Sequence, residues 1–188
     1  MHGLCIGLLY QKWCTIIDGD FMKKLIPLLI ILTVIGIIAV IIISMAKDKQ
    51  PVTILKNNIE MKALPLKVNF TNDPYCKMLI TTERNSVQVV SPDGDTWFFD
   101  DPGCMILWIQ EKSFRDNAKI WIHAIDTKRW IDARKAWYGI ADQTEMHYGF
   151  GAREKKVEGT IDFKEMELRM LRGENLANPK IRKKLLGE

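Results

Sequence analysis

An uninterrupted apolar run near the N-terminus constrains this chain more than any other feature. Residues 25–45 are almost entirely Leu, Ile, Val and Ala, and they carry no charge. Their 21 residues exceed the ~18 that a helix needs to cross the hydrocarbon core of a bilayer. The run is also longer than the roughly 7–15-residue apolar region of a cleaved signal peptide. We therefore predict that residues 25–45 form an uncleaved transmembrane signal anchor, held in membrane lipid.

The charges around this run indicate where the working protein starts and how it is oriented. Met22, Lys23 and Lys24 form a positively charged start directly before it. We interpret residues 1–24 as an N-terminal segment in which residues 1–21 are an upstream extension that is not translated. Lysines also follow the run, but a short N-terminus ahead of a single span usually stays in the cytoplasm. We expect a single-pass protein of the cytoplasmic (inner) membrane, with its soluble part in the periplasm.

The rest of the chain has the composition of one globular domain with attachments. Of its 188 residues, 47% are hydrophobic and 27% are charged, which argues against disorder. The net charge of +4 is small and spread along the chain, so we expect no nucleic-acid partner. We predict a linker over residues 46–64, a folded domain over 65–158, and a C-terminal helix with a basic, mobile tail over 159–188.

Hydrophobic periodicity and turn residues within the domain predict an α+β fold. Period-two apolar patterns and β-branched residues indicate strands, and Gly94 lies in a turn between two of them. Asp100 or Asp101 can cap a helix that has Pro102 in its first turn. Asp162 can cap a last helix. The expected strands are residues 66–70, 86–90, 96–99 and 119–124, and residues 78–82 are rich in β-forming residues. The expected helices are residues 103–112 and the segment after 162.

A thiol and a thioether lie two residues apart at Cys76 and Met78. Soft sulfur donors select Cu(I) or another soft cation over Mg²⁺ or Ca²⁺. The same pair also fits two buried core residues. Cys104 leaves two further readings open: a disulfide with Cys76 in an oxidising compartment, and a second sulfur site at a helix N-terminus, where the dipole would lower its pKa. The chain contains no CxxC motif.

Four separated motifs, in order, resemble the NosL family of nitrous oxide reductase accessory proteins. Together they cover about residues 66–155. The motifs are Cys76-Lys77-Met78, Phe98-Phe99-Asp100-Asp101-Pro102-Gly103-Cys104-Met105, Trp130-Ile131-Asp132-Ala133-Arg134-Lys135-Ala136-Trp137-Tyr138, and Met146-His147-Tyr148-Gly149-Phe150-Gly151-Ala152.

The resemblance implies a ββαβ-type antiparallel domain that binds Cu(I) and has no catalytic role. The family's proteins deliver copper for maturation of nitrous oxide reductase, and they work with an ABC-transporter-like membrane complex. Carried over to this chain, the resemblance implies Cys76, Met78 and Met146 as metal ligands. His147 and Cys104 are less favoured candidates.

The chain departs from the family pattern at several positions. Asp73 stands where many members have the first Cys of a CxxCGM motif, and Lys77 stands where they have Gly. Glu145 precedes Met146 where Pro is usual. A transmembrane helix also replaces the lipid anchor that many members carry. The missing cysteine leaves fewer sulfur donors, so metal affinity or geometry is expected to differ.

Two other functional classes remain open on the residues alone. One is a thiol-dependent redox protein that uses Cys76 and Cys104, against which the lack of CxxC and of a recognisable His base argues. The other is a membrane-tethered scaffold that binds no metal.

Overall fold

The structure is a computed structural model that describes residues 19–47 and 52–187. The chain divides into two compact units, one ending at Gln50 and the other starting at Pro51. Most of the predicted upstream extension, including Cys5 and Cys14, lies outside the described residues.

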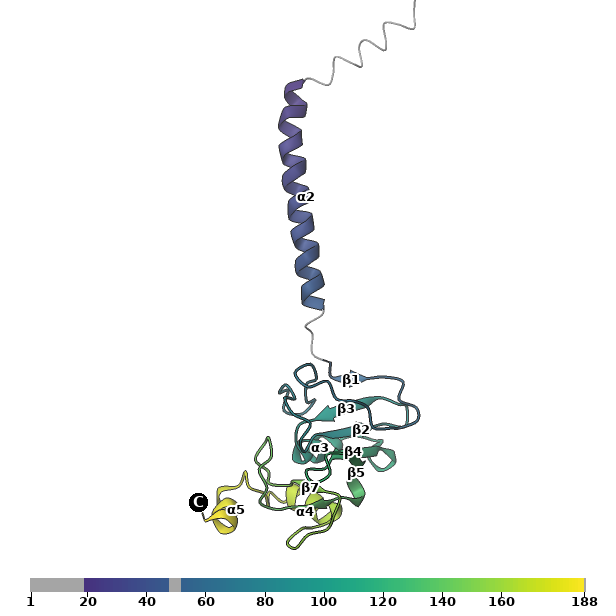
Figure 1. The fold of residues 1–188 in the computed structure, drawn as a ribbon, viewed down its shortest axis with the longest axis vertical. Coiled ribbons are helices and arrows are strands. Elements are labelled where there is room, and N and C mark those ends of the chain that lie inside the picture. Colours follow the sequence, from purple (N-terminus) through teal and green to yellow (C-terminus); the bar gives the residue numbers. More distant parts are fainter. Residues whose placement is uncertain (1–18, 48–51, 188) are drawn as a thin grey trace, which may run out of the picture. The chain divides into compact units, whose positions relative to one another are not determined.

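The first unit is the helix α2 (Gly19–Lys47), which contains the whole predicted apolar run (Figure 1). Its segment Leu25–Ser44 is 20 residues long, and none of it is buried. Thr33 donates its hydroxyl to the backbone carbonyls of Leu29 and Ile30, at 3.0 and 2.8 Å, so this polar group is satisfied inside the helix. An apolar helix of this length with satisfied backbone groups suits a bilayer. By length and composition, α2 is therefore a candidate membrane anchor or signal sequence.

Five antiparallel strands form the main sheet of the second unit, in the order β1-β3-β2-β4-β5. The central strand β2 pairs with both β3 and β4, so Val89 lies opposite Trp97 on one side and Ile120 on the other. The hairpin predicted around Gly94 is confirmed, and Gly94 has a φ of +80° there. The strands are β1 (Ile54–Leu55), β2 (Val87–Val90), β3 (Thr96–Phe99), β4 (Lys119–His123) and β5 (Trp130–Asp132).

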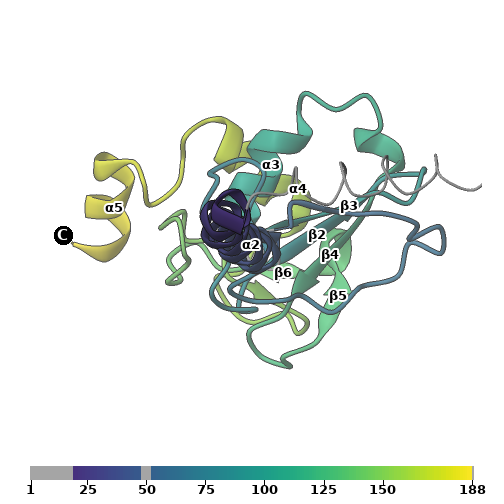
Figure 2. The ribbon, with the colours of Figure 1, turned by 90° about the horizontal axis from the view of Figure 1, so that it is seen from above.

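Two helices lie side by side on one face of this sheet (Figure 2). α3 (Pro102–Ile109) begins as predicted, with Asp101 as its N-cap and Pro102 in its first turn. α4 (Phe163–Leu171) is capped by Asp162, also as predicted. Its buried residues Phe163, Met166 and Met170 join α3 and the sheet in one core. The remaining elements are η1 (Arg115–Asn117), η2 (Ala133–Lys135), β6 (Trp137–Tyr138) paired with β7 (Ala152–Arg153), and α5 (Pro179–Leu186).

Residues 66–70, predicted as a strand, contain a turn instead. Asn69 has a φ of +62°, which breaks an extended conformation. Leu66 is buried beside Ile80, whereas Phe70 is 52% exposed. Alternation in five residues is a local signal, but a strand also needs a partner that only the tertiary fold supplies.

The boundaries of the domain are wider than the predicted 65–158. Residues 52–64 belong to the second unit rather than to a linker over 46–64, because β1 pairs with β3 and the Gln88 side chain bonds to the backbone of Leu64. The C-terminal segment 159–188 also belongs to this unit, and α5 forms where a mobile tail was expected. The α+β prediction is confirmed, and β2, β3, α3 and β4 follow each other as a ββαβ run.

Candidate metal centre

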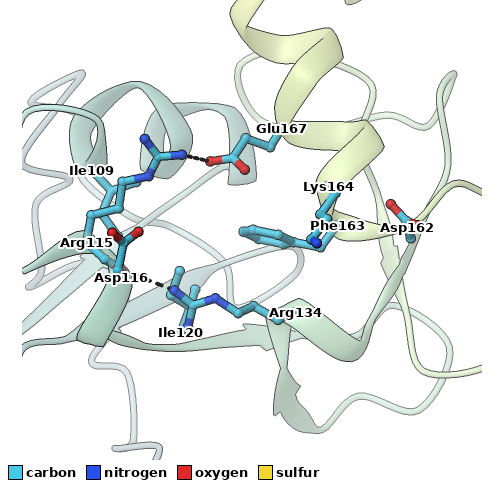
Figure 3. Close-up of a pocket in the computed structure, with 9 residues that line it drawn as sticks. All are labelled: Ile109, Arg115, Asp116, Ile120, Arg134, Asp162, Phe163, Lys164 and Glu167. Atoms are coloured by element: carbon cyan, nitrogen blue, oxygen red, sulfur yellow. Dashed lines mark hydrogen bonds and ion pairs between the residues drawn. The ribbon is translucent and has the colours of Figure 1, made fainter.

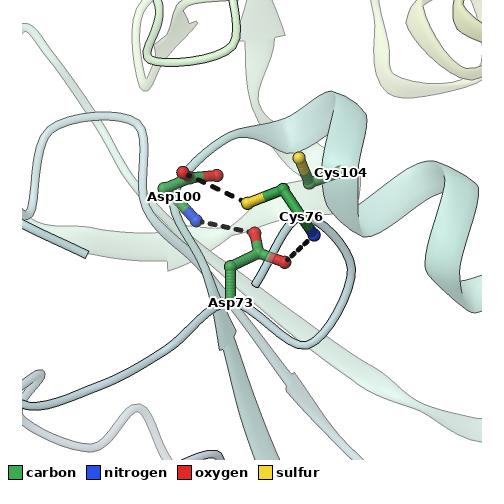
Figure 4. A group of neighbouring side chains, drawn as sticks. All are labelled: Asp73, Cys76, Asp100 and Cys104. Carbon is green, nitrogen blue, oxygen red and sulfur yellow. Dashed lines mark hydrogen bonds between the residues drawn. The ribbon is translucent and has the colours of Figure 1, made fainter. Parts of the chain in front are cut away.

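Four side chains that can bind a metal converge in the second unit (Figure 4). Asp73, Cys76, Asp100 and Cys104 each offer one ligand atom, and all four atoms lie within 4.8 Å of one another. They come from three segments: the loop over residues 73–78, the residue after β3, and the first turn of α3. We call these four residues the thiol–carboxylate cluster.

Asp73 folds the loop that carries Cys76. Its Oδ1 accepts hydrogen bonds from the backbone N–H of Tyr75 at 2.6 Å and of Cys76 at 3.1 Å. Its backbone N–H donates to the carbonyl of Met78 at 2.9 Å, which closes the loop. Its Oδ2 accepts from the backbone N–H of Asp100 at 3.2 Å, so the loop is fixed to the end of β3. This buried aspartate, 0% exposed, therefore holds Cys76 against Asp100.

Asp100 is a buried carboxylate with incomplete hydrogen bonding. It is 3% exposed, and its Oδ2 accepts the Cys76 thiol at an Sγ–Oδ2 distance of 3.6 Å. Its Oδ1 is buried and has no hydrogen-bond partner. Buried polar atoms are nearly always paired, so this oxygen is an acceptor that a proton donor or a cation could use.

The start of α3 positions Cys104 and draws a second loop toward the cluster. Asp101 accepts from the backbone N–H of Gly103 at 2.7 Å and from that of Met146 at 3.1 Å. A Cβ at Gly103 would lie 2.3 Å from Cδ2 of Tyr148, so the Tyr148 ring lies against this turn. Glycine at this position is required by that close approach.

Burial raises the pKa of both thiols and of two carboxyl groups at this site. Burial, followed by the nearby Asp73 and Asp100 carboxylates, raises the pKa of Cys76 to about 11. Burial and the same carboxylates also raise the pKa of Cys104, which contradicts the expected lowering by the helix dipole. Burial, then Asp73, raises the pKa of Asp100 to about 7. Burial also raises the pKa of Asp101.

No positive side chain offsets this concentration of acid. Among the described residues, no Lys, Arg or His forms an ion pair with Asp73, Asp100 or Asp101. Metal–thiolate bonds of about 2.3 Å let one ion join two sulfurs about 4.6 Å apart. The cluster can thus hold one cation, which would replace the thiol protons and pair with the carboxylates.

The predicted site residues divide into three groups. Cys76 and Cys104 lie together in the cluster. Met78 follows Cys76 by two residues but is 47% exposed, and Met146 is half-buried against the same core as Cys76. The exposed His147 instead lines a hollow beside α5.

Asp73 and Asp100 were missed as site residues in the sequence prediction. The NosL resemblance places Asp73 where many members have a cysteine, which was a usable signal. Asp100 and Asp101 form an adjacent carboxylate pair, and capping of α3 accounts for Asp101 alone.

A separate cleft of about 440 Å³ lies between η1, η2 and α4 (Figure 3). The Phe163 ring points into it, and Arg115 pairs with Glu167 across an Nη2–Oε1 distance of 2.7 Å. Arg134 donates to the carbonyls of Ala118 and Arg115. Because these charges are already engaged within the protein and the lining contains no sulfur, we do not assign the metal to this cleft.

Fold and site together define a small α+β domain with a buried thiol–carboxylate cluster, joined to an N-terminal apolar helix long enough to cross a membrane. No protein-family model matches the chain, and no curated protein matches it. The resemblance to the NosL family rests on the motif residues alone.

Proposed function

We propose that this protein is a membrane-anchored metallochaperone that binds one Cu(I) in the periplasm. The observation that carries the proposal is the convergence of two thiols and two carboxylates within 4.8 Å, with one carboxylate oxygen unpartnered. Two thiolates favour a soft ion, and Cu(I) is softer than Zn²⁺. The order of the four NosL-like motifs favours copper among the soft ions.

Cys76 and Cys104 are the central ligands in this proposal. Asp73 orients Cys76 through the backbone of its loop, and Asp100 accepts a hydrogen bond from the Cys76 thiol. The thioethers of Met78 and Met146 are the outer ligands that the NosL resemblance implies. Met78 is exposed at the edge of the loop that carries Cys76. Its side chain is therefore free to turn toward the Cys76 sulfur without unfolding the loop.

The raised pKa values of the two thiols suit a carrier that must release its metal. Both thiols have raised pKa values, so Cu(I) has to displace protons to bind. That competition lowers affinity at neutral pH relative to preformed thiolates. We propose that α2 anchors the protein in the inner membrane. We further propose that the recipient is nitrous oxide reductase or its ABC-transporter-like assembly complex.

The closeness of the thiols favours one alternative, a thiol-dependent redox protein using Cys76 and Cys104. The lack of a CxxC motif argues against it.

Native mass spectrometry of the full chain in detergent, loaded with Cu(I) under reducing conditions, tests the proposal. We expect one Cu(I) in the wild type. Cys76→Ser and Cys104→Ser should each weaken binding by more than the roughly 10–100-fold that loss of an outer hydrogen-bond partner causes. Met78→Leu and Met146→Leu should weaken it less, and Met61→Leu, beside Trp121, is the matched control. Equal copper loading by wild type and Cys76→Ser would refute the proposal.

A further inference from the structure

The helix α5 (Pro179–Leu186) presents three lysines on one face. Lys180, Lys183 and Lys184 are spaced by three and four residues, which places them on the same side of a helix. All three are exposed, and none pairs with an acidic group among the described residues. The helix contains no acidic residue. We call these three residues the lysine face.

The other side of α5 holds the helix to the domain. Arg182 donates its Nε–H to the carbonyl of Leu176 at 2.9 Å. Arg182 and Leu186 line the same hollow as His147 and Leu176. Asn178 caps the helix start through the backbone N–H of Lys180, so α5 is a fixed element and not a fraying tail. Figures 1 and 2 both show α5 at the periphery of the domain.

We propose that the lysine face binds the anionic phospholipid headgroups of the membrane that holds α2. This inference rests on the proposed membrane anchoring. A lysine ammonium is a compact point charge that suits a phosphate surface, and each basic residue near such a surface contributes about 1 kcal/mol. The domain shares a chain with the anchor, so it meets headgroups at a high effective concentration whatever its orientation.

The residues of α5 favour a lipid surface over an acidic protein as its binding partner. The lysine face carries positive charge but no hydrogen-bond acceptor and no aromatic side chain. Acceptors or aromatic anchors would indicate a protein interface. Binding would restrict the domain's orientation at the membrane surface, where a membrane-embedded recipient of copper would be met.

Hydrogen–deuterium exchange of residues 179–187 in the full chain tests this proposal. The protein is compared in nanodiscs of phosphatidylglycerol with phosphatidylcholine and in discs of phosphatidylcholine alone. With three lysines at about 1 kcal/mol each, we expect α5 amides to exchange about tenfold slower or more in the anionic discs. High salt should remove this protection, because it screens exposed charges.

Two triple variants make the test specific to α5. Lys180→Gln/Lys183→Gln/Lys184→Gln should lose the lipid dependence, and glutamine keeps a similar helix propensity. Lys67→Gln/Lys155→Gln/Lys164→Gln removes three exposed lysines elsewhere and should retain it.

Each contrary outcome identifies which proposal fails. Equal exchange of wild-type α5 in both discs would overturn the lipid proposal and favour an acidic protein partner. Retained lipid dependence in the α5 variant would also overturn it. A chain that enters neither disc would overturn membrane anchoring itself, together with this inference. Cu(I) loading is measured separately and does not depend on any of these results.

Discussion

The Cys76 sulfur lies 3.6 Å from Oδ2 of Asp100, inside a cluster that contains no positive side chain among the described residues. Burial raises the pKa of both groups, and the Asp100 carboxylate further disfavours ionisation of the Cys76 thiol. The hydrogen bond from the thiol offsets part of this effect for Asp100, because it favours the ionised carboxylate. Under the proposed function, the metal-free domain gives up stability to keep these donors together for a metal.

Asp100→Asn should stabilise the metal-free protein and weaken metal binding. The amide removes a buried charge whose burial, with an unpaired oxygen, costs roughly 1–3 kcal/mol. We expect a gain of that order at pH 8, and little gain at pH 5, where Asp100 is already protonated. Urea unfolding followed by tryptophan fluorescence measures the change. Asp95→Asn, which removes an exposed pair with Lys56, is the control and should shift stability by about 0.5 kcal/mol or less. Destabilisation by Asp100→Asn at pH 8 would contradict this account.

The metal-free protein should lose stability as the pH rises from about 4 to about 7. Asp100 has a pKa of about 7 in the folded state, and burial also raises that of Asp101. In this window the folded state binds more protons than the unfolded state, so the free energy of unfolding falls with pH. For each pH unit over which the folded state holds one extra proton, the free energy of unfolding falls by about 1.4 kcal/mol. Unfolding curves from pH 4 to pH 9 measure this slope. A stability that rises over the whole range would show that Asp100 is not held in this environment.

Lys77→Gly should be more stable than Lys77→Ala by about 1 kcal/mol, the cost of a left-handed conformation for a residue with a Cβ. Lys77 has a φ of +65° in the loop that carries Cys76. Both variants lose the hydrogen bond from the Lys77 side chain to the carbonyl of Pro74, so their comparison isolates the backbone term. Thermal unfolding of the two variants gives the difference. Equal stability would mean that the loop changes conformation once the lysine is removed.

Mild oxidation should join Cys76 to Cys104 and abolish Cu(I) binding. Their sulfurs lie within 4.8 Å, and both cysteines are free thiols. A disulfide needs an S–S distance of about 2.05 Å, so the two side chains have to move closer for the bond to form. Both pKa values are raised, so cross-linking should be faster at pH 9 than at pH 7. Peptide mapping identifies the link, and reductant should restore metal uptake. Full Cu(I) loading of the oxidised protein would exclude the thiols as ligands.

Local signals in the sequence predicted the local elements well. Asp101 and Pro102 marked the start of α3, Gly94 marked the β2/β3 turn, and Asp162 marked the start of α4, because capping and turn chemistry act over a few residues. The strand predicted at residues 66–70 failed because pairing is decided by distant segments. The predicted linker was too long for the same reason, since β1 gains its structure only from β3.

The sequence by itself determined the apolar helix and the α+β class, and it singled out Cys76 as a candidate ligand, because length, hydropathy and residue chemistry are properties of short stretches. The tertiary structure decided which donors meet. It placed Cys104 and Asp100 beside Cys76, left the Met78 side chain exposed, and turned His147 toward the hollow beside α5. Those distances depend on how β3, α3 and the loop at 73–78 pack together, and no spacing along the chain specifies that packing.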